Sequence, residues 1–173
     1  QPFFFFFSMG GAAIAHNGNI TNADALRRAL IERSSIFQTS LDSQCITHLM
    51  ARALQRNIPE RMEDALRRVE GAFSIVAMTR TKLIGVRDPL GVRPLVLGRL
   101  GDGWALSSET CALDIIGADF VREIAPGEMV VITEKGIESH FPFRQQNPRF
   151  CIFEHVYFSR PDSIIGGRSV YET

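Results

Sequence analysis

The sequence predicts an α+β fold, in which helices pack on antiparallel sheets. A short apolar run over residues 12–15 is typical of a buried strand, and the chain that follows has the apolar spacing of helices. From Gly71 onward, pairs of short apolar runs enclose turn residues, as in hairpins. Because strand–helix–strand units do not repeat along the sequence, layers of helices on antiparallel strands are favoured over a doubly wound parallel sheet.

Three helices are expected after the first strand. Residues 22–32 and 42–54 repeat apolar side chains at helical spacing, and a third such segment follows them. Asn22 is the candidate N-cap of the first helix, and Ser40 or Asp42 of the second. The side chains expected to face the core are Leu26, Leu30 and Ile31, then Ile46, Leu49, Met50 and Ala53, and, after Pro59, Met62, Ala65, Leu66 and Val69.

The second half of the chain is expected to hold hairpins and one short helix. The hairpins pair residues 72–78 with 82–86, 95–98 with 104–107, and 130–133 with 137–140, and the helix covers residues 110–116. Phe3–Phe7 is a run of phenylalanines that, as a strand, would have to be buried on both faces, so it receives no assignment. Residues 145–149 are polar and contain Pro148, which is typical of a loop at a domain boundary.

Composition and charge exclude several classes of protein. Lys plus Arg and Asp plus Glu both number 19, and this balance argues against nucleic acid as the main partner. Neither a membrane-spanning run nor the basic start of a signal peptide is found, so no membrane partner is expected. Cys45, Cys111 and Cys151 are too widely spaced for a zinc pattern, and free thiols of this kind indicate a cytoplasmic protein.

The candidate functional residues lie in residues 15–19, with the sequence Ala-His-Asn-Gly-Asn. They follow the first expected strand and precede a helix, so Asn17 and Gly18 are expected on a strand-to-helix turn. The Asn17 side-chain amide and the Gly18 backbone N–H are neutral donors that can stabilise a developing oxyanion. An Asn-Gly pair is also common in plain turns, and these residues alone favour the turn.

Further segments accompany this motif. They are residues 16–23 (HNGNITNA), 84–98 (IGVRDPLGVRPLVLG), 107–114 (SSETCALD), 126–128 (PGE) and 151–163 (CIFEHVYFSRPDS). Together and in this order they resemble the amidophosphoribosyltransferase family, and the resemblance covers nearly the whole chain. Other class II glutamine amidotransferases share the first segment but not the end of the last one, which makes the resemblance specific.

The resemblance implies an Ntn-hydrolase-like αββα sandwich of two antiparallel sheets between helical layers, incomplete in this chain. It implies a partial glutamine amidotransferase type 2 (glutaminase) domain over residues 1–144, followed over 145–173 by a linker and the start of a missing phosphoribosyltransferase domain. In this family an N-terminal Cys hydrolyses glutamine, with its own α-amino group as base. The ammonia then reacts with phosphoribosyl pyrophosphate to give 5-phosphoribosylamine in de novo purine synthesis. The implied partners are glutamine, the missing domain and further copies of the parent chain.

Individual positions match functional residues of this family. Asn17 and Gly18 match the oxyanion-hole pair, and Asp42 matches the acidic residue that binds the α-amino group of glutamine. A carboxylate at a helix start is also a plain N-cap, and the local sequence leaves both interpretations of Asp42 open. Cys151 matches a [4Fe–4S] ligand of some members, but a lone Cys cannot hold a cluster. No metal is therefore expected in this chain; Mg²⁺, and in some members [4Fe–4S], belong to the full-length parent.

The chain also departs from the family pattern. Gln1 stands where the nucleophile Cys would be needed, and the HxRY-type segment whose Arg binds the glutamine carboxylate is missing. Beside Asp42, Leu41 and Gln44 replace a Ser and a Glu of the family. We therefore expect an amidophosphoribosyltransferase as the parent and an inactive chain in isolation. The alternatives are a catalytically inert Ntn-like domain for binding or assembly, and the glutaminase domain of another class II amidotransferase.

The remaining polar residues of interest are expected to be structural. The Arg-Asp-Pro at 87–89 and the Arg-Pro at 93–94 are interpreted as tight turns with Arg–carboxylate pairing rather than as a phosphate site. His48 adjoins the apolar stripe of a helix, and Cys45 and Cys111 are expected to be buried as small apolar side chains.

Overall fold

The computed structural model describes residues 2–144, 146–149 and 151–172 of the chain. The helices are α1 (Ala23–Ile31), α2 (Ser43–Arg52), α3 (Ile58–Leu66) and α4 (Thr110–Ile116). The strands are β1 (Phe3–Phe7), β2 (Gly10–Ile20), β3 (Gly71–Thr79), β4 (Leu83–Arg87), β5 (Val96–Leu100), β6 (Gly103–Ser107), β7 (Asp119–Glu123), β8 (Met129–Thr133) and β9 (Gly136–His140).

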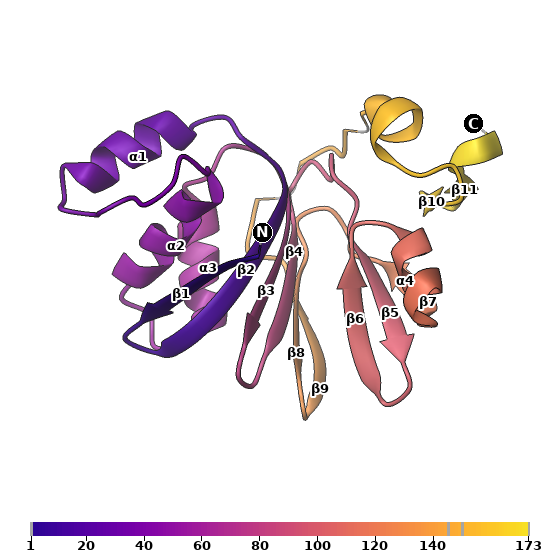
Figure 1. Ribbon diagram of the computed structural model, residues 1–173, viewed down its shortest axis with the longest axis horizontal. Coiled ribbons are helices and arrows are strands. Elements are labelled where there is room, and N and C mark those ends of the chain that lie inside the picture. Colours follow the sequence, from indigo (N-terminus) through magenta and orange to yellow (C-terminus); the bar gives the residue numbers. More distant parts are fainter. Residues whose placement is uncertain (1, 145, 150, 173) are drawn as a thin grey trace.

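These elements form four layers (Figure 1). A six-stranded antiparallel sheet, in the order β1-β2-β3-β4-β8-β9, lies in the middle, and α1, α2 and α3 cover one of its faces. A three-stranded antiparallel sheet, β6-β5-β7, packs on the other face, and α4 covers the outer side of this smaller sheet. The layers confirm the predicted α+β class, with two antiparallel sheets between helices.

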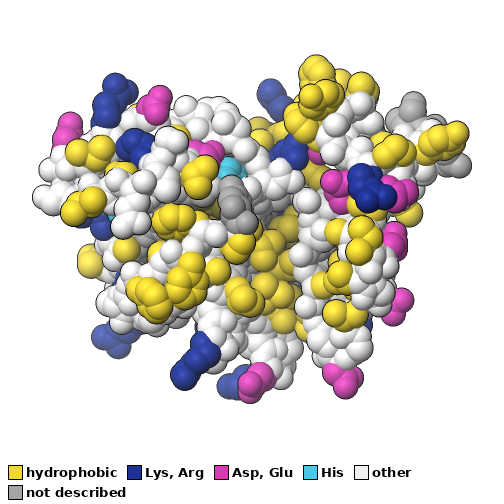
Figure 2. Space-filling view, viewed as in Figure 1, with side chains coloured by type: hydrophobic (Ala, Val, Ile, Leu, Met, Phe, Trp, Pro, Cys, Tyr) yellow, Lys and Arg dark blue, Asp and Glu magenta, His cyan; other side chains and the backbone are white. Residues whose placement is uncertain are grey.

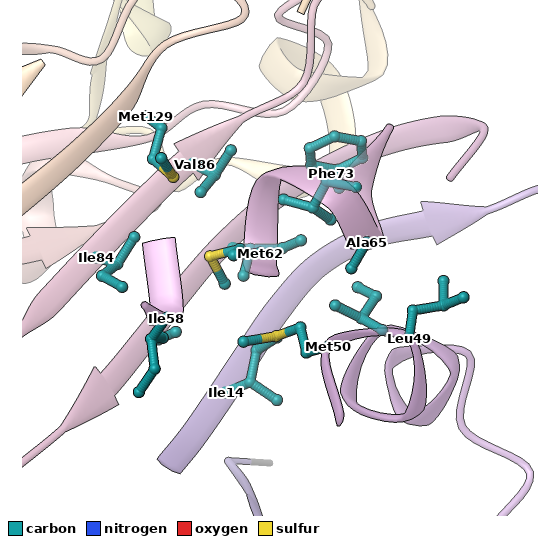
Figure 3. Packing of buried hydrophobic residues seen from close by; sticks show 14 of the residues in the cluster. Ile14, Leu49, Met50, Ile58, Met62, Ala65, Phe73, Ile84, Val86 and Met129 are labelled. Atoms are coloured by element: carbon teal, nitrogen blue, oxygen red, sulfur yellow. The ribbon is translucent and has the colours of Figure 1, made fainter. Parts of the chain in front are cut away.

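The larger core lies between the helices and the six-stranded sheet (Figure 3). Leu49 and Met50 of α2 and Met62 of α3 are buried there against Ile14 of β2, as their helical spacing predicted. Burial of each such side chain is worth about 1.5–3 kcal/mol. This cluster fixes α2, and with it the loop before α2, against the strand that carries the Asn-Gly motif.

A second core lies between the two sheets, where Leu97 of β5 packs near Val130 of β8. Gly98 faces away from this core, toward α4. A Cβ at Gly98 would approach a side-chain carbon of Leu113 to 2.7 Å, so glycine lets the helix lie close to the smaller sheet. At the N-terminal end of α4, the Thr110 hydroxyl accepts the Ile164 N–H at 2.8 Å.

The predicted helices are confirmed, although Ile31 of α1, which was expected to face the core, is 52% exposed. The hairpins β3–β4, β5–β6 and β8–β9 are the predicted ones. Asn22 occupies the N-cap position of α1, but its side chain makes no capping bond. The Asn22 amide instead donates to the Arg68 carbonyl and accepts the Glu70 N–H, which joins the start of α1 to the entry of β3. Strand β7 was not predicted, because most of its side chains are exposed and lack the expected alternation. In the described part of the chain, no helix is long and apolar enough to cross a membrane.

The phenylalanine run is a regular strand, which corrects the expectation that it would need burial on both faces. β1 pairs antiparallel with β2 at the edge of the larger sheet. Phe3, Phe5 and Phe7 pack against the core, whereas Phe4 and Phe6 are 60% and 78% exposed. The strand therefore alternates between a covered and an uncovered face, because the helices cover only one side of this edge.

Residues 151–172 lie against the end of the smaller sheet near α4 (Figure 1). They form a π-helical turn η1 (Glu154–Phe158), a short β10 (Ile164–Ile165) and β11 (Arg168–Ser169) hairpin, and a 3₁₀ turn η2 (Val170–Glu172). Glu109 Oε2 accepts the Arg160 N–H and the Ser163 hydroxyl, both at 2.8 Å. Glu109 precedes α4, so the segment is tied to the start of that helix.

Candidate active site

Asn17 and Gly18 lie inside β2 rather than on a turn, which corrects the prediction. β2 continues to Ile20, and α1 begins only at Ala23. The long neighbour β3 causes this, because its pairing extends from Ala12 opposite Thr79 to Ile20 opposite Gly71. Pairing along the whole strand outweighs the local turn preference of an Asn-Gly pair.

Alternation along β2 sends adjacent side chains to opposite faces of the larger sheet. His16 points to the helical layer, where its Nδ1 lies 3.2 Å from Ser43 Oγ and 3.5 Å from Asp42 Oδ1. Asn17 points to the other face, opposite Ser74 of β3. Its side-chain Oδ1 accepts a hydrogen bond from the guanidinium of Arg93 at 2.6 Å.

Position 18 requires a glycine, and its N–H points away from the neighbouring strand β3. Its φ is +153°, and a Cβ there would collide with the carbonyl oxygen of Ala72. Gly18 lies opposite Phe73 of β3. The backbone N–H and C=O of Phe73 both face Asp88: the Asp88 N–H donates to Phe73 O at 2.8 Å, and the Phe73 N–H donates to Asp88 Oδ2 at 3.4 Å. Gly18 and Phe73 therefore form a non-hydrogen-bonded pair. On the far side, the described pairing of β1 with β2 covers Gly10 to Ile14.

Asp42 caps α2 and also binds β2. Its Oδ1 accepts the Ser43 N–H at 2.7 Å, and its Oδ2 accepts the Ile20 N–H at 3.1 Å. Burial raises the pKa of Asp42, but these N–H donors and His16 outweigh burial and hold the pKa below its ordinary value. The side chain remains 25% exposed. The predicted N-cap is thus confirmed, and the carboxylate lies against the same end of β2 as Asn17 and Gly18.

Arg93 is a site residue that the sequence interpretation missed. The Arg-Pro dipeptide predicts a turn but gives no indication of where the guanidinium points. Its Nη2 donates to Asn17 Oδ1, and its Nη1 lies 2.6 Å from Glu154 Oε1. The guanidinium also lies over the Phe158 ring, 4.6 Å from the centroid.

The turn at residues 87–91 is structural, as predicted. Asp88 is fully buried, and its Oδ1 accepts the Leu90 N–H at 2.9 Å. Arg87 donates to the carbonyl oxygens of Gly91 and Ile124 and lies 3.3 Å from Glu123 Oε2. The Arg87 guanidinium is therefore held in place by acceptors of three residues, including the predicted carboxylate partner.

The thiols and the polar residues near them do not form a metal site in the described chain. Cys45 and Cys111 are buried, as predicted, and Cys151 is half-buried. His48 packs against Phe37, with ring centroids 4.5 Å apart, in agreement with a structural role. No cluster of three or more His, Cys, Asp or Glu side chains that could hold a metal ion occurs within residues 2–144, 146–149 and 151–172. The residues present therefore do not fit either a [4Fe–4S] cluster or Mg²⁺.

Replacing Gly18 with alanine is expected to destabilise the domain and disturb the site. The new Cβ would collide with the Ala72 carbonyl, and a side chain at this φ costs about 1–3 kcal/mol. The midpoint of denaturant-induced unfolding measures the effect. Gly10→Ala is the matched control, because Gly10 lies in the same strand with φ +108° and has nothing within 4 Å of its Cβ position. Equal losses for the two variants would contradict the predicted collision.

Burial of His16 is expected to make the domain less stable in mild acid. Burial lowers the pKa of His16 below 6.5 and outweighs Asp42, which raises it. The unfolded chain then binds more protons than the folded chain just below pH 6.5, so stability present above that pH is lost as the pH falls. Thermal midpoints between pH 5 and 8 should show this slope, and His16→Gln should reduce it.

His48→Gln is the companion variant to His16→Gln, since burial also lowers the pKa of His48. Each variant should remove its own part of the slope. A slope that both variants leave unchanged would show that these histidines do not cause the acid sensitivity.

Comparison with known proteins agrees with this fold. The profile of a family described as "Glutamine amidotransferase domain" matches residues 1–114. The chain is 49% identical to an amidophosphoribosyltransferase of Rhizobium etli over 100% of its own length and 36% of that relative. It is 47% identical to amidophosphoribosyltransferase 1, chloroplastic, of Arabidopsis thaliana, over 100% of the chain and 31% of the relative. A solved glutamine phosphoribosylpyrophosphate amidotransferase from B. subtilis superposes with a TM-score of 0.95 at 41% identity, over 99% of this chain and 38% of that one.

Two antiparallel sheets between helical layers, with an Asn-Gly pair inside strand β2 of the larger sheet, define a domain of the Ntn-hydrolase class. Within that class the chain belongs to the glutamine amidotransferase domain family. It corresponds to the glutamine amidotransferase portion of amidophosphoribosyltransferases and spans about a third of the length of the curated relatives that it matches.

Proposed function

We propose that these residues form the glutaminase part of a longer amidophosphoribosyltransferase. That enzyme hydrolyses glutamine and passes the ammonia to phosphoribosyl pyrophosphate, which gives 5-phosphoribosylamine for purine synthesis. The observation that carries the proposal is the pair of donors on β2. The Gly18 N–H points away from β3, and the Asn17 amide is held by its oxygen, which leaves its nitrogen to donate elsewhere.

The two donors fit the oxyanion of a tetrahedral intermediate. Amide N–H groups are neutral, and a rigid strand holds them in place before the reaction begins, so little reorganisation is needed when charge develops. Asp42 is assigned to the α-amino group of glutamine, because its carboxylate is ionised, partly exposed and fixed to β2 through Ile20. The family's nucleophile, an N-terminal Cys, is not among these residues, and neither is the arginine that binds the substrate carboxylate.

We assign residues 1–144 to the glutaminase domain and 145–173 to the linker and the start of a phosphoribosyltransferase domain. Support comes from the exposed apolar side chains on and beside η1. Phe153, Val156 and Tyr157 are 57%, 74% and 79% exposed, which is unusual for side chains of this size and fits a surface that another domain covers. Residue 145 lies outside the described residues, so we propose the boundary between the two domains from the sequence alone.

The remaining assignments concern the full-length enzyme. We propose that Mg²⁺, and in some family members a [4Fe–4S] cluster with Cys151 among its ligands, belong to that enzyme and involve residues beyond this chain. We further propose a cytoplasmic homo-oligomer. The Arabidopsis relative is named as chloroplastic, so location within this family differs between members.

The test is a pair of assays on the full-length protein. Glutamine-dependent and ammonia-dependent release of pyrophosphate from phosphoribosyl pyrophosphate should both occur, and glutaminase activity should accompany the first. Ammonia-dependent activity without glutaminase activity would support the inert-domain alternative. Glutaminase activity without any reaction of phosphoribosyl pyrophosphate would assign the domain to another class II amidotransferase.

A further inference from the structure

Arg93 and Asn17 are far apart in sequence but in direct contact. Arg93 lies in the connection between β4 and β5, and Asn17 lies in β2. The contact is short, at 2.6 Å, and joins guanidinium Nη2 to the side-chain Oδ1. A guanidinium has only donors, so the end of the Asn17 amide that faces it must be the oxygen. The Asn17 Nδ2 amino group, the only donor in this side chain, must then point away from Arg93.

The guanidinium is itself held on several sides. Glu154 is only 2% exposed, and its Oε1 lies 2.6 Å from Arg93 Nη1. The Arg93 Cζ lies over the Phe158 ring, 4.6 Å from its centroid, so the cation is attracted to the face of the ring. Both partners come from η1, so the segment after residue 150 fixes an arginine that reaches back to β2.

The backbone of Arg93 is anchored beside Asn17 as well. The Ser74 hydroxyl donates to the Arg93 carbonyl at 3.0 Å, and Ser74 lies directly opposite Asn17 in the β2–β3 pair. Arg87 Nε donates to the same carbonyl at 2.9 Å. Cross-strand neighbours in such a pair project from the same face of the sheet. Asn17, Ser74 and Arg93 therefore form one connected cluster on that face.

We propose that Arg93, fixed by Glu154 and Phe158, is a positioning residue that locks the Asn17 amide with Nδ2 directed to the oxyanion. This inference rests on the proposed function for its effect on rate, but the contact itself can be tested separately. Without Arg93 the Asn17 side chain could rotate or exchange its two ends, and a rotated amide would present oxygen to a negative charge. The interaction acts on the transition state, where the oxyanion forms, more than on bound glutamine.

The test is a double-mutant cycle in the full-length protein with Arg93→Met and Asn17→Ala. Arg93→Met should lower kcat for glutamine hydrolysis on the order of tenfold or more, with KM changed less than about twofold. In the Asn17→Ala background the same change should have almost no effect on kcat, because no amide remains to be positioned. Equal effects in both backgrounds would overturn the proposal. Circular dichroism and the thermal unfolding profile report whether the glutaminase domain of each variant is folded, and ammonia-dependent activity reports on the other domain.

Three further variants keep the experiment decisive. Arg93→Met leaves the buried Glu154 without its cation, so the cycle is repeated with Arg93→Met/Glu154→Gln if the single variant does not fold. Arg93→Lys retains a donor and the charge, and it should recover part of the lost kcat. Arg99→Met is the matched control, because Arg99 lies over the Trp104 ring at 4.5 Å in the smaller sheet and donates to the Gly101 carbonyl, away from Asn17. It should leave kcat unchanged.

A crystal structure of full-length Arg93→Met separates this inference from the proposed function. If the wild type has no glutaminase activity, the proposed function fails, but the position of the Asn17 side chain still tests the contact. We expect the Asn17 side chain to lose its single orientation in the Arg93→Met variant. An Asn17 side chain that keeps its wild-type position would overturn the positioning role, whatever the activity.

Discussion

A polypeptide of these 173 residues is expected to release no ammonia from glutamine above the background rate. Its thiols are poor candidates for the missing nucleophile. Cys45 is completely buried, and burial raises the pKa of its thiol, which keeps it protonated. Cys111 is also buried, beside Glu109. Loss of the nucleophile from a catalytic unit costs on the order of 10⁶-fold in a serine protease, and donors alone leave little activity.

Ammonia release by the purified polypeptide, with circular dichroism to verify folding, measures this prediction. The full-length protein in the same assay is the positive control. Turnover at a rate near that of the full-length protein would contradict the prediction. In that case Cys151→Ala would show whether the half-buried thiol of the last segment is responsible.

Local sequence patterns predicted correctly which side chains are buried where burial depends on residues that are close in the sequence. The apolar spacing of α2 and α3 gave the buried face correctly, since Met50 and Met62 are almost fully buried. The Asn-Gly pair could be recognised because both donors are adjacent in the chain. The conformation of this pair could not be predicted, because it is extended only where β3 pairs alongside it and would otherwise favour a turn.

The sequence did not predict contacts between segments that are far apart in the chain. Arg93 meets Asn17 across 76 positions, and no local pattern indicates where a guanidinium will point. The same limit applies to Phe3–Phe7, where the identical residues carry no alternation that could reveal which side chains face inward. Only the neighbouring β2 and the helices on one face of the sheet decide that Phe5 is covered and Phe6 is exposed.

Asn17→Ala in the full-length protein is expected to slow glutamine hydrolysis about a hundredfold, with a much smaller effect on glutamine binding. One oxyanion donor is worth on the order of 3 kcal/mol, and it acts on the intermediate rather than on the ground-state amide. Amination with external ammonia should be retained, because that reaction belongs to the other domain. Steady-state kinetics with glutamine and with ammonia as donor measure both effects.

Asn17→Asp is the informative companion variant. A carboxylate of the same shape still accepts the Arg93 guanidinium, so the cluster with Glu154 should stay intact. It has no N–H to donate, and its charge opposes a developing oxyanion. The rate should therefore fall at least as far as in Asn17→Ala, while thermal stability stays closer to that of the wild type. If the aspartate variant hydrolyses glutamine faster than the alanine variant, Asn17 acts by holding Arg93 in place and not as the oxyanion donor.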